Sequence, residues 1–279
     1  MIEATSRREA LAPAPTARAR RHPELGLVWG LALRDLKRLK MDTMRWVGLV
    51  LQPLLLWALL GSGLGSVFTV PGAPDLDYHR FFFPGLVLMI ALFTTIFSTM
   101  AVIDDRDHGF LQQVLVAPGS RTSMVLGKVV GVLFIALVQL ALVLPAAPLA
   151  GYDLAAIAWG PLLVGYTLAV VMLTCLSFSL AWVSRTSHGY HAIMGVLLIP
   201  LWMVSGSVFP LPHHGLLGAI GWADPMTYAT DALRHAFDGG TSGVAFTSPI
   251  VSYVALGGLA VLTLALAARV ARRPVGGLA

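Results

Sequence analysis

Residues 81–103 read FFFPGLVLMIALFTTIFSTMAVI and contain no charged side chain over 23 consecutive positions. A bilayer core of roughly 30 Å requires a helix of about 20 apolar residues, so this stretch predicts a membrane-spanning helix. Five other blocks of similar length are mainly apolar and predict further spans. They are residues 46–68, 124–149, 158–183, 190–209 and 249–268. The sequence therefore predicts an all-α integral membrane protein with six transmembrane helices.

The composition of the chain excludes an ordinary soluble domain. Of its 279 residues, 57% are hydrophobic and only 12% are charged, and the mean hydropathy is +0.78. Soluble domains carry roughly 25% charged residues. The net charge is +5, and the basic residues crowd the first 45 positions and the C-terminal end, beside apolar blocks. This placement is typical of cytoplasmic flanks that face anionic lipid, and it argues against nucleic acid as a partner.

The placement of Lys and Arg also predicts the orientation of the spans. With the N-terminus inside, the inner segments hold 17 of the 19 basic residues, and only Arg80 and Arg234 face outward. Cytoplasmic loops carry such an excess, so both termini are predicted to be cytoplasmic. Residues 1–23 are rich in Pro and Arg and predict a disordered cytoplasmic tail. Residues 24–270 form one predicted membrane domain, and residues 271–279 form a second tail.

An amphipathic helix is predicted over residues 24–40, just before the first span. Its apolar positions recur at steps of three and four residues, and charged residues, Arg34 and Asp35 among them, occupy the remaining face. The apolar positions are Leu25, Val28, Trp29, Ala32, Leu36 and Leu39. An apolar stripe with a basic face and a Trp favours a helix that lies in the membrane interface. An ordinary solvated helix is the alternative.

The loop between the second and third spans predicts a cytoplasmic helix over residues 104–117. Asp104, Asp105 and Asp107 suit a helix N-terminus, where the helix dipole favours negative charge, and Pro118 ends the helix. Its apolar face is formed by Phe110, Leu111, Val114 and Leu115. Such a helix can dock onto a soluble partner or rest on the membrane surface, and the residues alone leave both interpretations open.

A second informative stretch follows the fifth span. Asp224 and Pro225 form a strong helix start, because the carboxylate caps the first turn and proline suits its first position. Residues 216–222 are apolar but too few to span a membrane. Two short helices between the fifth and sixth spans are therefore predicted to enter the outer leaflet or to lie on it. Asp231 and Arg234 can pair one turn apart on the second helix.

Motifs for energy conversion and catalysis are absent from the sequence. Gly127-Lys128 is followed by Val129, so the Lys-Ser/Thr pair of a phosphate-binding loop is missing. No predicted span has a charged residue near its centre, which argues against an ion-coupled carrier. His188 and His191 lack the Cys or carboxylate support of a metal site. We therefore predict no catalytic residue, no metal and no cofactor on this chain, and we expect its energy to come from a partner.

Two ordered motifs within this layout resemble those of the ATP-binding-cassette type 2 transporter permeases, particularly the group of daunorubicin-resistance and nodulation-factor exporter membrane subunits. The first comprises Asp105-Arg106-Asp107-His108-Gly109, Leu115, Pro118-Gly119-Ser120-Arg121 and Gly127-Lys128. The second comprises Ser205-Gly206, Phe209-Pro210, Asp224-Pro225-Met226-Thr227-Tyr228 and Leu233-Arg234. The resemblance spans about residues 24–270. It departs at Asp105, Asp107 and Gln113, where glutamate is usual, and at Asp224, where asparagine is usual.

The resemblance implies a permease that pairs with a second permease copy, either itself or a close paralogue. It also implies a separately encoded ATPase subunit, which would bind the ATP and Mg. The ATPase-coupling helix would contain Asp104, Asp105, Arg106, Asp107, Gly109, Phe110, Leu111, Val114, Leu115 and Pro118. The outer gate would contain Ser205, Gly206, Phe209, Pro210, Asp224, Pro225, Thr227, Tyr228 and Arg234. The helix over residues 24–40 would be a connecting helix in the membrane interface.

The leading hypothesis is a multi-pass permease of the cytoplasmic (inner) membrane that exports an amphiphilic small molecule, a lipid or a glycan. On this hypothesis the chain is not itself an enzyme. An ion-coupled secondary carrier is the alternative within transport, and a non-transporting membrane scaffold is the alternative outside it. A membrane-bound enzyme is disfavoured, because His188, His191 and Asp224 are its only catalytic material and lie on opposite predicted sides of the membrane.

Overall fold

The computed structural model describes residues 23–41, 43–65, 68–70, 73–108 and 120–272. Six of its helical runs are long and apolar enough to cross a membrane. They are α2 (Thr43–Leu64), α3 (Tyr78–Asp107), α5 (Arg121–Val143) with its 3₁₀ extension η2 (Leu144–Ala150), α6 (Trp159–Val183), the run from α7 to η4 (Ser187–Ser207) and α11 (Pro249–Ala271). The residues that the structure describes contain no β-strand. The predicted all-α membrane fold with six spans is confirmed.

Polar caps explain where three of these spans begin. The side chains of Asp77, Ser120 and Ser248 accept hydrogen bonds from backbone N–H groups in the first turns of α3, α5 and α11. These N–H groups have no partner within their own helix, so a polar side chain at this position stabilises the helix start. The predicted spans agree with the helices to within about four residues at each end.

The fifth span changes its helical geometry along its length. Regular turns alternate with π-helical turns in the order α7 (Ser187–Ile193), η3 (Met194–Leu198), α8 (Ile199–Trp202) and η4 (Met203–Ser207). Pro200 has no backbone N–H, so the regular hydrogen-bond ladder cannot continue through it. Near its end the span reaches Gly206, whose φ of 81° is readily adopted only by glycine. The irregular backbone therefore leads directly into the segment predicted as the outer gate.

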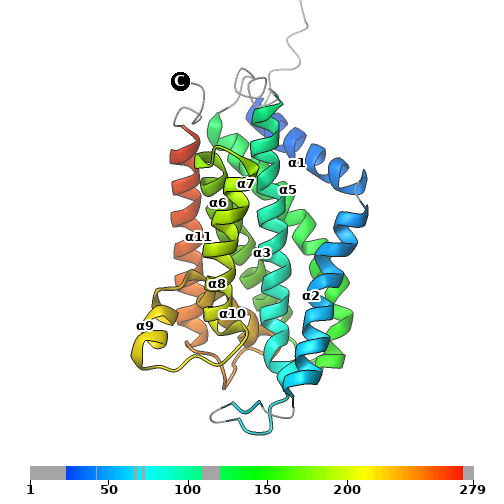
Figure 1. Ribbon diagram of the computed structural model, residues 1–279, viewed down its shortest axis with the longest axis vertical. Coiled ribbons are helices and arrows are strands. Elements are labelled where there is room, and N and C mark those ends of the chain that lie inside the picture. The colour runs from blue at the N-terminus through cyan, green and yellow to red at the C-terminus, as the bar shows by residue number, and fades with distance from the viewer. Residues whose placement is uncertain (1–22, 42, 66–67, 71–72, 109–119, 273–279) are drawn as a thin grey trace, which may run out of the picture.

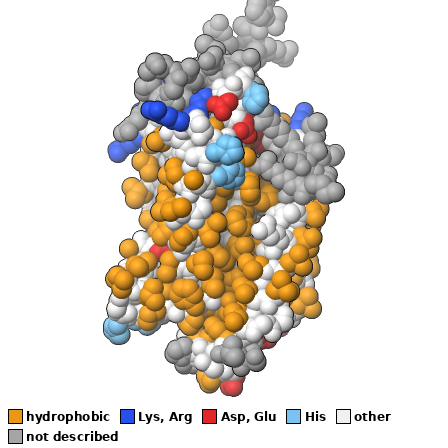
Figure 2. All heavy atoms as spheres, viewed as in Figure 1, with side chains coloured by type: hydrophobic (Ala, Val, Ile, Leu, Met, Phe, Trp, Pro, Cys, Tyr) orange, Lys and Arg blue, Asp and Glu red, His pale blue; other side chains and the backbone are white. Residues whose placement is uncertain are grey.

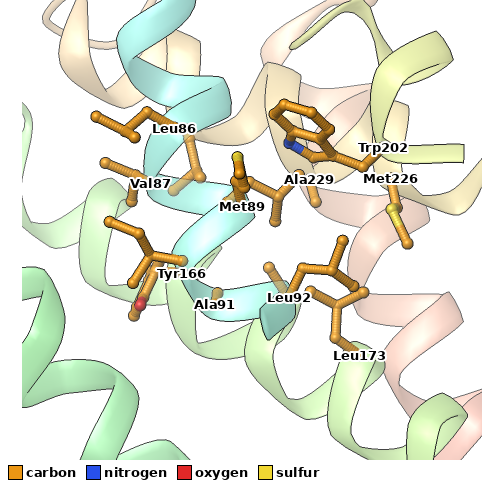
Figure 3. Packing of buried hydrophobic residues seen from close by; sticks show 14 of the residues in the cluster. Leu86, Val87, Met89, Ala91, Leu92, Tyr166, Leu173, Trp202, Met226 and Ala229 are labelled. Carbon is orange, nitrogen blue, oxygen red and sulfur yellow. The ribbon is translucent and has the colours of Figure 1, made fainter. Parts of the chain in front are cut away.

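α3 is the central helix of the bundle (Figure 1). Of its spanning window 67% is buried, and it packs against α2, α5 and α6 and, near one end, α10 (Pro225–Phe237). Figure 3 shows Met89 and Leu92 of α3 on the side of Leu173 of α6 and Trp202 of α8. The hydrophobic core therefore follows α3 through the bundle.

The surface of the bundle is apolar around its middle. The flanking helices α2 and α11 bury only 22% and 28% of their spanning windows, and Leu59 and Val254 are each 70% exposed. Figure 2 shows hydrophobic side chains over the middle of one face and charged side chains gathered at its upper end. Lipid favours such a surface and water does not, so the chain is a multi-pass membrane protein.

α1 (Pro23–Met41) crosses α5 close to one end of the bundle, called here the α1 end (Figure 1). Two glycines of α5 allow a close approach. A Cβ at Gly127 would lie 3.1 Å from the carbonyl oxygen of Val28, and a Cβ at Gly131 would lie 3.3 Å from the Cα of Ala32. Small residues four positions apart let two helix backbones pack closely in a membrane protein.

The packed face of α1 differs in part from the predicted apolar stripe. Trp29 was expected on the stripe but is 61% exposed. Asp35 was expected on the polar face but is 8% exposed, because it lies one turn after Ala32 on the side that contacts α5. The predicted helix is present, and its position in a membrane interface stays a prediction.

Two short helices connect the fifth span to α11 at the opposite end of the bundle, called here the α10 end (Figure 1). α10 is almost wholly buried, because Ala229, Ala232 and Leu233 pack in the core among α3, α6 and α11. α9 (Gly215–Ala223) is more exposed, with Leu216 at 78% and Trp222 at 48%. The segment thus forms two helices, and their depth in a membrane stays a prediction.

Candidate functional site

A charged network joins three helices at the α1 end. Lys128 Nζ of α5 lies 2.7 Å from Asp35 Oδ2 of α1, and both side chains are 7% exposed. Arg34 Nη2 lies 3.1 Å from Asp35 Oδ1 and 2.7 Å from Asp105 Oδ2 of α3. Arg34, Asp35, Asp105 and Lys128 are called here the α1-end network. It ties α1 to the two spans that flank residues 109–119.

The charge balance of this network keeps Asp35 ionised. Burial by itself would raise the pKa of Asp35, but Lys128 and Arg34 together hold that pKa below its ordinary value. A buried carboxylate is stable only with such partners, so the pair is a structural requirement of the contact between α1 and α5. Sequence reasoning missed this pair. The available signal was the spacing of Asp35 from Val28 and Ala32, which puts it on their side of the helix.

The last turns of α3 are tied to the link between α6 and α7. Arg106 donates from Nη1 to the carbonyl oxygen of Ser184 at 2.8 Å and from Nη2 to that of Arg185 at 2.7 Å. Ser187 Oγ donates to Asp104 Oδ1 at 3.2 Å. These bonds hold the end of the central helix against the start of the fifth span.

The predicted position of the acidic residues is wrong. Asp104, Asp105, Arg106 and Asp107 were expected to begin a separate helix, but they form the C-terminal turns of α3, which ends at Asp107. Residues 91–107 contain neither glycine nor proline, so the helix of the second span continues past Ile103 into the charged residues. Carboxylates at a helix C-terminus oppose the helix dipole, and the hydrogen bond and ion pair from Ser187 and Arg34 offset that cost. The other predicted coupling residues, Gly109, Phe110, Leu111, Val114, Leu115 and Pro118, lie outside the described residues.

Both flanks of residues 109–119 are nevertheless fixed at the α1 end. The preceding flank is held through Asp105 and Arg106. The following flank begins α5, where Ser120 caps the helix and Arg121 Nη1 donates to the carbonyl oxygen of Ala271 at 3.0 Å. The residues that flank this segment therefore contact α1, α11 and the link between α6 and α7.

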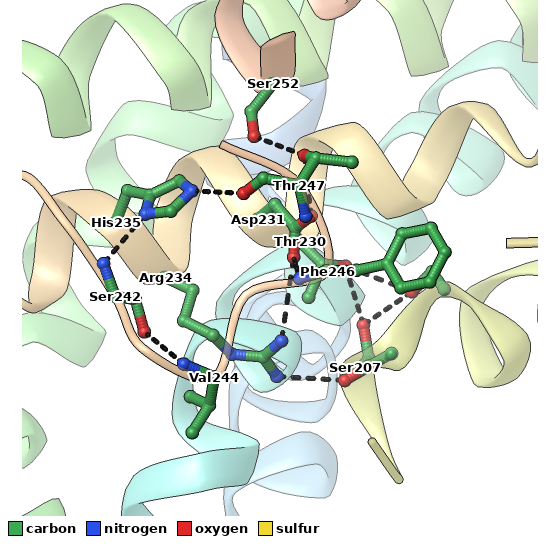
Figure 4. Close-up of polar contacts among 12 residues, drawn as sticks. Ser207, Thr230, Asp231, Arg234, His235, Ser242, Val244, Phe246, Thr247 and Ser252 are labelled. Carbon is green, nitrogen blue, oxygen red and sulfur yellow. Dashed lines mark hydrogen bonds and ion pairs between the residues drawn. The ribbon is translucent and has the colours of Figure 1, made fainter. Parts of the chain in front are cut away.

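At the α10 end, a buried arginine connects α10 to the fifth span and to α3 (Figure 4). Arg234 is 2% exposed. Its Nη2 donates to the carbonyl oxygens of Gly206 at 2.9 Å and Phe81 at 3.4 Å, and its Cζ lies 4.5 Å from the centre of the Phe81 ring. Its Nη1 lies 3.7 Å from Asp231 Oδ1. The predicted pair exists, but as one part of a buried network.

Asp231 fixes the segment that leads into α11. Its Oδ1 accepts from the backbone N–H of Phe246 at 3.0 Å, and its Oδ2 accepts from the N–H and hydroxyl of Thr247 at 2.7 and 2.8 Å. Burial raises the pKa of Asp231, and Arg234 and these donors oppose that rise. The carboxylate of Asp231 therefore accepts its hydrogen bonds mainly from the loop that precedes α11.

Three hydroxyls complete the contact between α10 and the fifth span. Ser205, Ser207 and Thr230 are fully buried, and their oxygens lie 2.8 to 3.0 Å from one another. Ser205, Ser207, Thr230, Asp231, Arg234 and Thr247 are called here the α10-end network. His235 adds a further link, because its Nδ1 accepts from the N–H of Ser242 at 2.8 Å and its Nε2 lies 2.8 Å from the carbonyl oxygen of Thr247.

The remaining predicted gate residues lie around this network. Asp224 caps α10 through a 2.9 Å bond from the N–H of Met226 to its Oδ1, as predicted, with Pro225 in the first turn. Tyr228 donates to the carbonyl oxygen of Trp222 at 2.7 Å and so ties α9 to α10. Thr227 is buried in the same turn, and Phe209 and Pro210 are half-buried just after the fifth span.

Asp224 is an unusual cap. It is 1% exposed, and its Oδ2 has no hydrogen-bond partner among the described residues. Burial raises its pKa to about 7, although the bond from Met226 lowers it. A protonated aspartate has the size and donor capacity to resemble asparagine. This explains how aspartate can stand where the resemblance leads one to expect asparagine.

The family model described as "ABC-2 type transporter" matches residues 26–237, from α1 through α10. The matched stretch includes the α1-end network and all of the α10-end network except Thr247. The chain belongs to the ABC-2 type transporter family. The predicted family resemblance is confirmed, and the fold of this ABC-2 type transporter has its two polar networks at opposite ends of the central helix.

Relatives of this ABC-2 type transporter are named as permeases. The probable multidrug ABC transporter permease YbhR of Escherichia coli K12 is 29% identical over 168 residues, which are 59% of this chain and 45% of that protein. The putative transport permease ycf38 of Cyanophora paradoxa is 28% identical over 195 residues, and that of Pyropia yezoensis is 26% identical over 206. Each covers 67% of this chain and 66% of the relative. The chain therefore spans less than half of the Escherichia coli relative.

Proposed function

We propose that the chain is the membrane-spanning permease subunit of an ATP-binding-cassette exporter. It moves an amphiphilic small molecule, a lipid or a glycan out of the cytoplasm, and a separately encoded subunit binds ATP and Mg and hydrolyses the ATP. Membership of the ABC-2 type transporter family supports the proposal most strongly. Members of this family normally work with an ATPase partner in a membrane, and relatives are named as permeases.

The proposed location is the cytoplasmic (inner) membrane, with both termini in the cytoplasm. The separation of charge supports this orientation: Arg106, Lys128 and Arg185 lie toward the α1 end, whereas Arg80 and Arg234 lie at the α10 end. Basic residues favour the cytoplasmic side. On this orientation the α1 end faces the ATPase and the α10 end forms the outer gate.

The central helix offers a direct mechanical connection between these ends. Asp105, near the C-terminus of α3, pairs with Arg34 in the α1-end network. Phe81, in the first turn of α3, receives Arg234 of the α10-end network on its carbonyl oxygen and its ring. When nucleotide binding moves the ATPase, the docking segment at residues 109–119 would displace α3 and the gate together as rigid bodies.

A second permease copy, identical or a close paralogue, is part of the proposal. The exposed apolar face of α2, with Leu51, Leu55 and Leu59, has room for lipid or for a second permease. Two permease copies, each bound to an ATPase subunit, would enclose the transport path of the exported molecule between them.

The test is co-purification with the ATPase encoded beside this chain, in neutral detergent. The variant carries Phe110→Ala and Leu111→Ala in the predicted docking segment. A matched control carries Leu216→Ala and Leu217→Ala, an exposed apolar pair on α9 at the other end. We expect the ATPase to co-purify with the wild type and the control and to be lost from the variant.

Loss of the ATPase from the control as well would overturn the docking assignment. If the wild type binds no ATPase, the exporter proposal fails, and the secondary carrier and membrane scaffold take its place. Dependence of transport on a proton gradient would then distinguish the carrier from the scaffold.

A further inference from the structure

A pocket of about 370 Å³ lies at the α10 end, between the turn after the fifth span and the loop before α11. Its lining includes Gly206, Pro210, Leu211, Arg234, Val244 and Phe246. Pro212, His213 and Gly243 also line it and are exposed, so the pocket opens to the surface.

The guanidinium of Arg234 has unused hydrogen-bonding capacity toward this pocket. Its Nη2 is occupied by two carbonyl oxygens. Its Nη1 has Asp231 Oδ1 at 3.7 Å, which is too long for a hydrogen bond. Its Nε has no partner among the described residues. An oxygen of a ligand placed beside Nη1 would give this group an acceptor at hydrogen-bond distance, which is favourable for a donor in a buried position.

The wall beside Nη1 carries no side chain. A Cβ at Gly206 would lie 3.8 Å from Nη1 and 3.6 Å from Leu211, and the positive φ of this residue disfavours any other amino acid. The glycine therefore leaves space immediately beside the arginine. Because Nη2 already donates to two carbonyl oxygens, Nη1 is the group left to donate to an oxygen of a carboxylate or a phosphate in this space.

The rest of the lining is apolar and aromatic. Leu211 and Val244 face the pocket, and the ring of His213 is stacked on Phe246 with centroids 4.8 Å apart and planes 11° apart. Figure 4 shows Phe246 and Val244 on either side of the Arg234 side chain. One charged position within an apolar lining is the composition expected for an amphiphile rather than for a free ion.

We propose that this pocket binds the acidic head group, a phosphate or a carboxylate, of an amphiphile. Arg234 bonds the head-group oxygens, and the surface of Leu211, Val244 and Phe246 contacts the adjoining apolar part. The inference deepens the proposed export function and rests on it for the outward direction of the pocket. Binding itself requires only the permease, so the two proposals can fail separately.

The experiment measures thermal unfolding of the purified full chain in neutral maltoside detergent while dodecyl phosphate is added. Dodecyl glucoside has the same chain and a neutral head group, and inorganic phosphate supplies the anion alone. Ala245→Phe fills the pocket, and Ala219→Phe makes the same change on the exposed side of α9, outside the lining. Arg234→Gln removes the charge.

We expect dodecyl phosphate to raise the unfolding temperature of the wild type and Ala219→Phe saturably, by about 3 °C. Ala245→Phe and Arg234→Gln should lose at least two thirds of this rise, and dodecyl glucoside and inorganic phosphate should give none. An undiminished rise in Ala245→Phe would overturn the pocket assignment, even if Arg234→Gln fails to fold. An equal rise with dodecyl glucoside would overturn the acidic head group, and one with inorganic phosphate alone would overturn the amphiphile.

Discussion

The α1-end network and the α10-end network are held together by different chemistry. At the α1 end, long charged side chains reach across from separate helices, as in the Lys128–Asp35 and Arg34–Asp105 pairs. At the α10 end, Arg234 and Asp231 bond mainly to backbone groups. Charge pairs between long side chains can exchange partners as helices shift, whereas bonds to backbone groups fix local geometry. The α1-end network can thus adapt to a shift between helices, whereas the α10-end network fixes its local geometry.

The largest effect is expected at the α10 end, from Asp231→Leu. This change leaves three donors from Phe246 and Thr247 without an acceptor and removes the counter-charge of Arg234. Breaking a buried charged network of this kind costs roughly 4 to 5 kcal/mol. Thermal unfolding in detergent should show a loss of about 10 °C or more. Asp231→Asn, which keeps one acceptor oxygen, should lose less, and a loss below about 2 °C for the leucine variant would contradict the network.

The next largest loss of stability is expected at the α1 end, and it tests whether Asp35 and Lys128 stabilise the protein as a pair. Asp35→Leu leaves Lys128 buried without its carboxylate and should cost about 3 kcal/mol. Adding Lys128→Met removes the stranded charge and should restore most of the lost stability, because an apolar pair can replace a buried ion pair. The same thermal assay measures both proteins. Additive losses in the double variant would show that the two side chains do not interact.

A smaller effect, and one that depends on pH, is expected at Asp224. Burial raises the pKa of this carboxyl from 3.8 to about 7, so the folded protein holds its proton more tightly than the unfolded chain does. The contribution of Asp224 to stability is therefore highest below about pH 4, falls as the pH rises from about 4 to 7, and levels off above that range. Asp224→Asn should remove this fall and stabilise the protein at pH 8 by about 2 kcal/mol. Parallel pH profiles for wild type and variant would refute the assignment.

The smallest effect concerns the close packing of α1 on α5. Gly30→Ala on α1 meets no atom within 4 Å, so it should gain about 0.5 to 1 kcal/mol from helix propensity. Gly127→Ala places its methyl group 3.1 Å from the carbonyl oxygen of Val28, which should cancel that gain. The two variants should therefore differ by about 1 kcal/mol in unfolding free energy. Equal stabilisation by both would show that α1 is not tightly packed there.

The features that could be predicted from the sequence are those that depend on composition and on local signals along the chain. The six spans follow from apolar blocks such as residues 81–103, and the start of α10 follows from Asp224 and Pro225. The end of α3 was predicted wrongly, because charged residues were taken to end the span, although Asp104 and Asp105 remain helical once Ser187 and Arg34 contact them.

Contacts between residues far apart in the sequence could not be predicted from composition and local signals. The Asp35–Lys128 pair joins positions 93 residues apart, and nothing in either local pattern names the other. The same holds for Arg234 and the carbonyl oxygen of Phe81, which depend on how α10 inserts beside α3. The family resemblance predicted that Arg234 belongs to an outer gate, whereas its burial and its pocket could be recognised only from the fold.

The most direct test of the account is the rate of ATP hydrolysis by the partner ATPase in proteoliposomes, with and without this chain. The account predicts that the wild-type permease raises the rate several-fold and that the Phe110→Ala, Leu111→Ala variant does not, at equal amounts of both proteins. An ATPase rate that is the same with and without the wild-type permease would contradict the central claim that the two form one ATP-driven exporter.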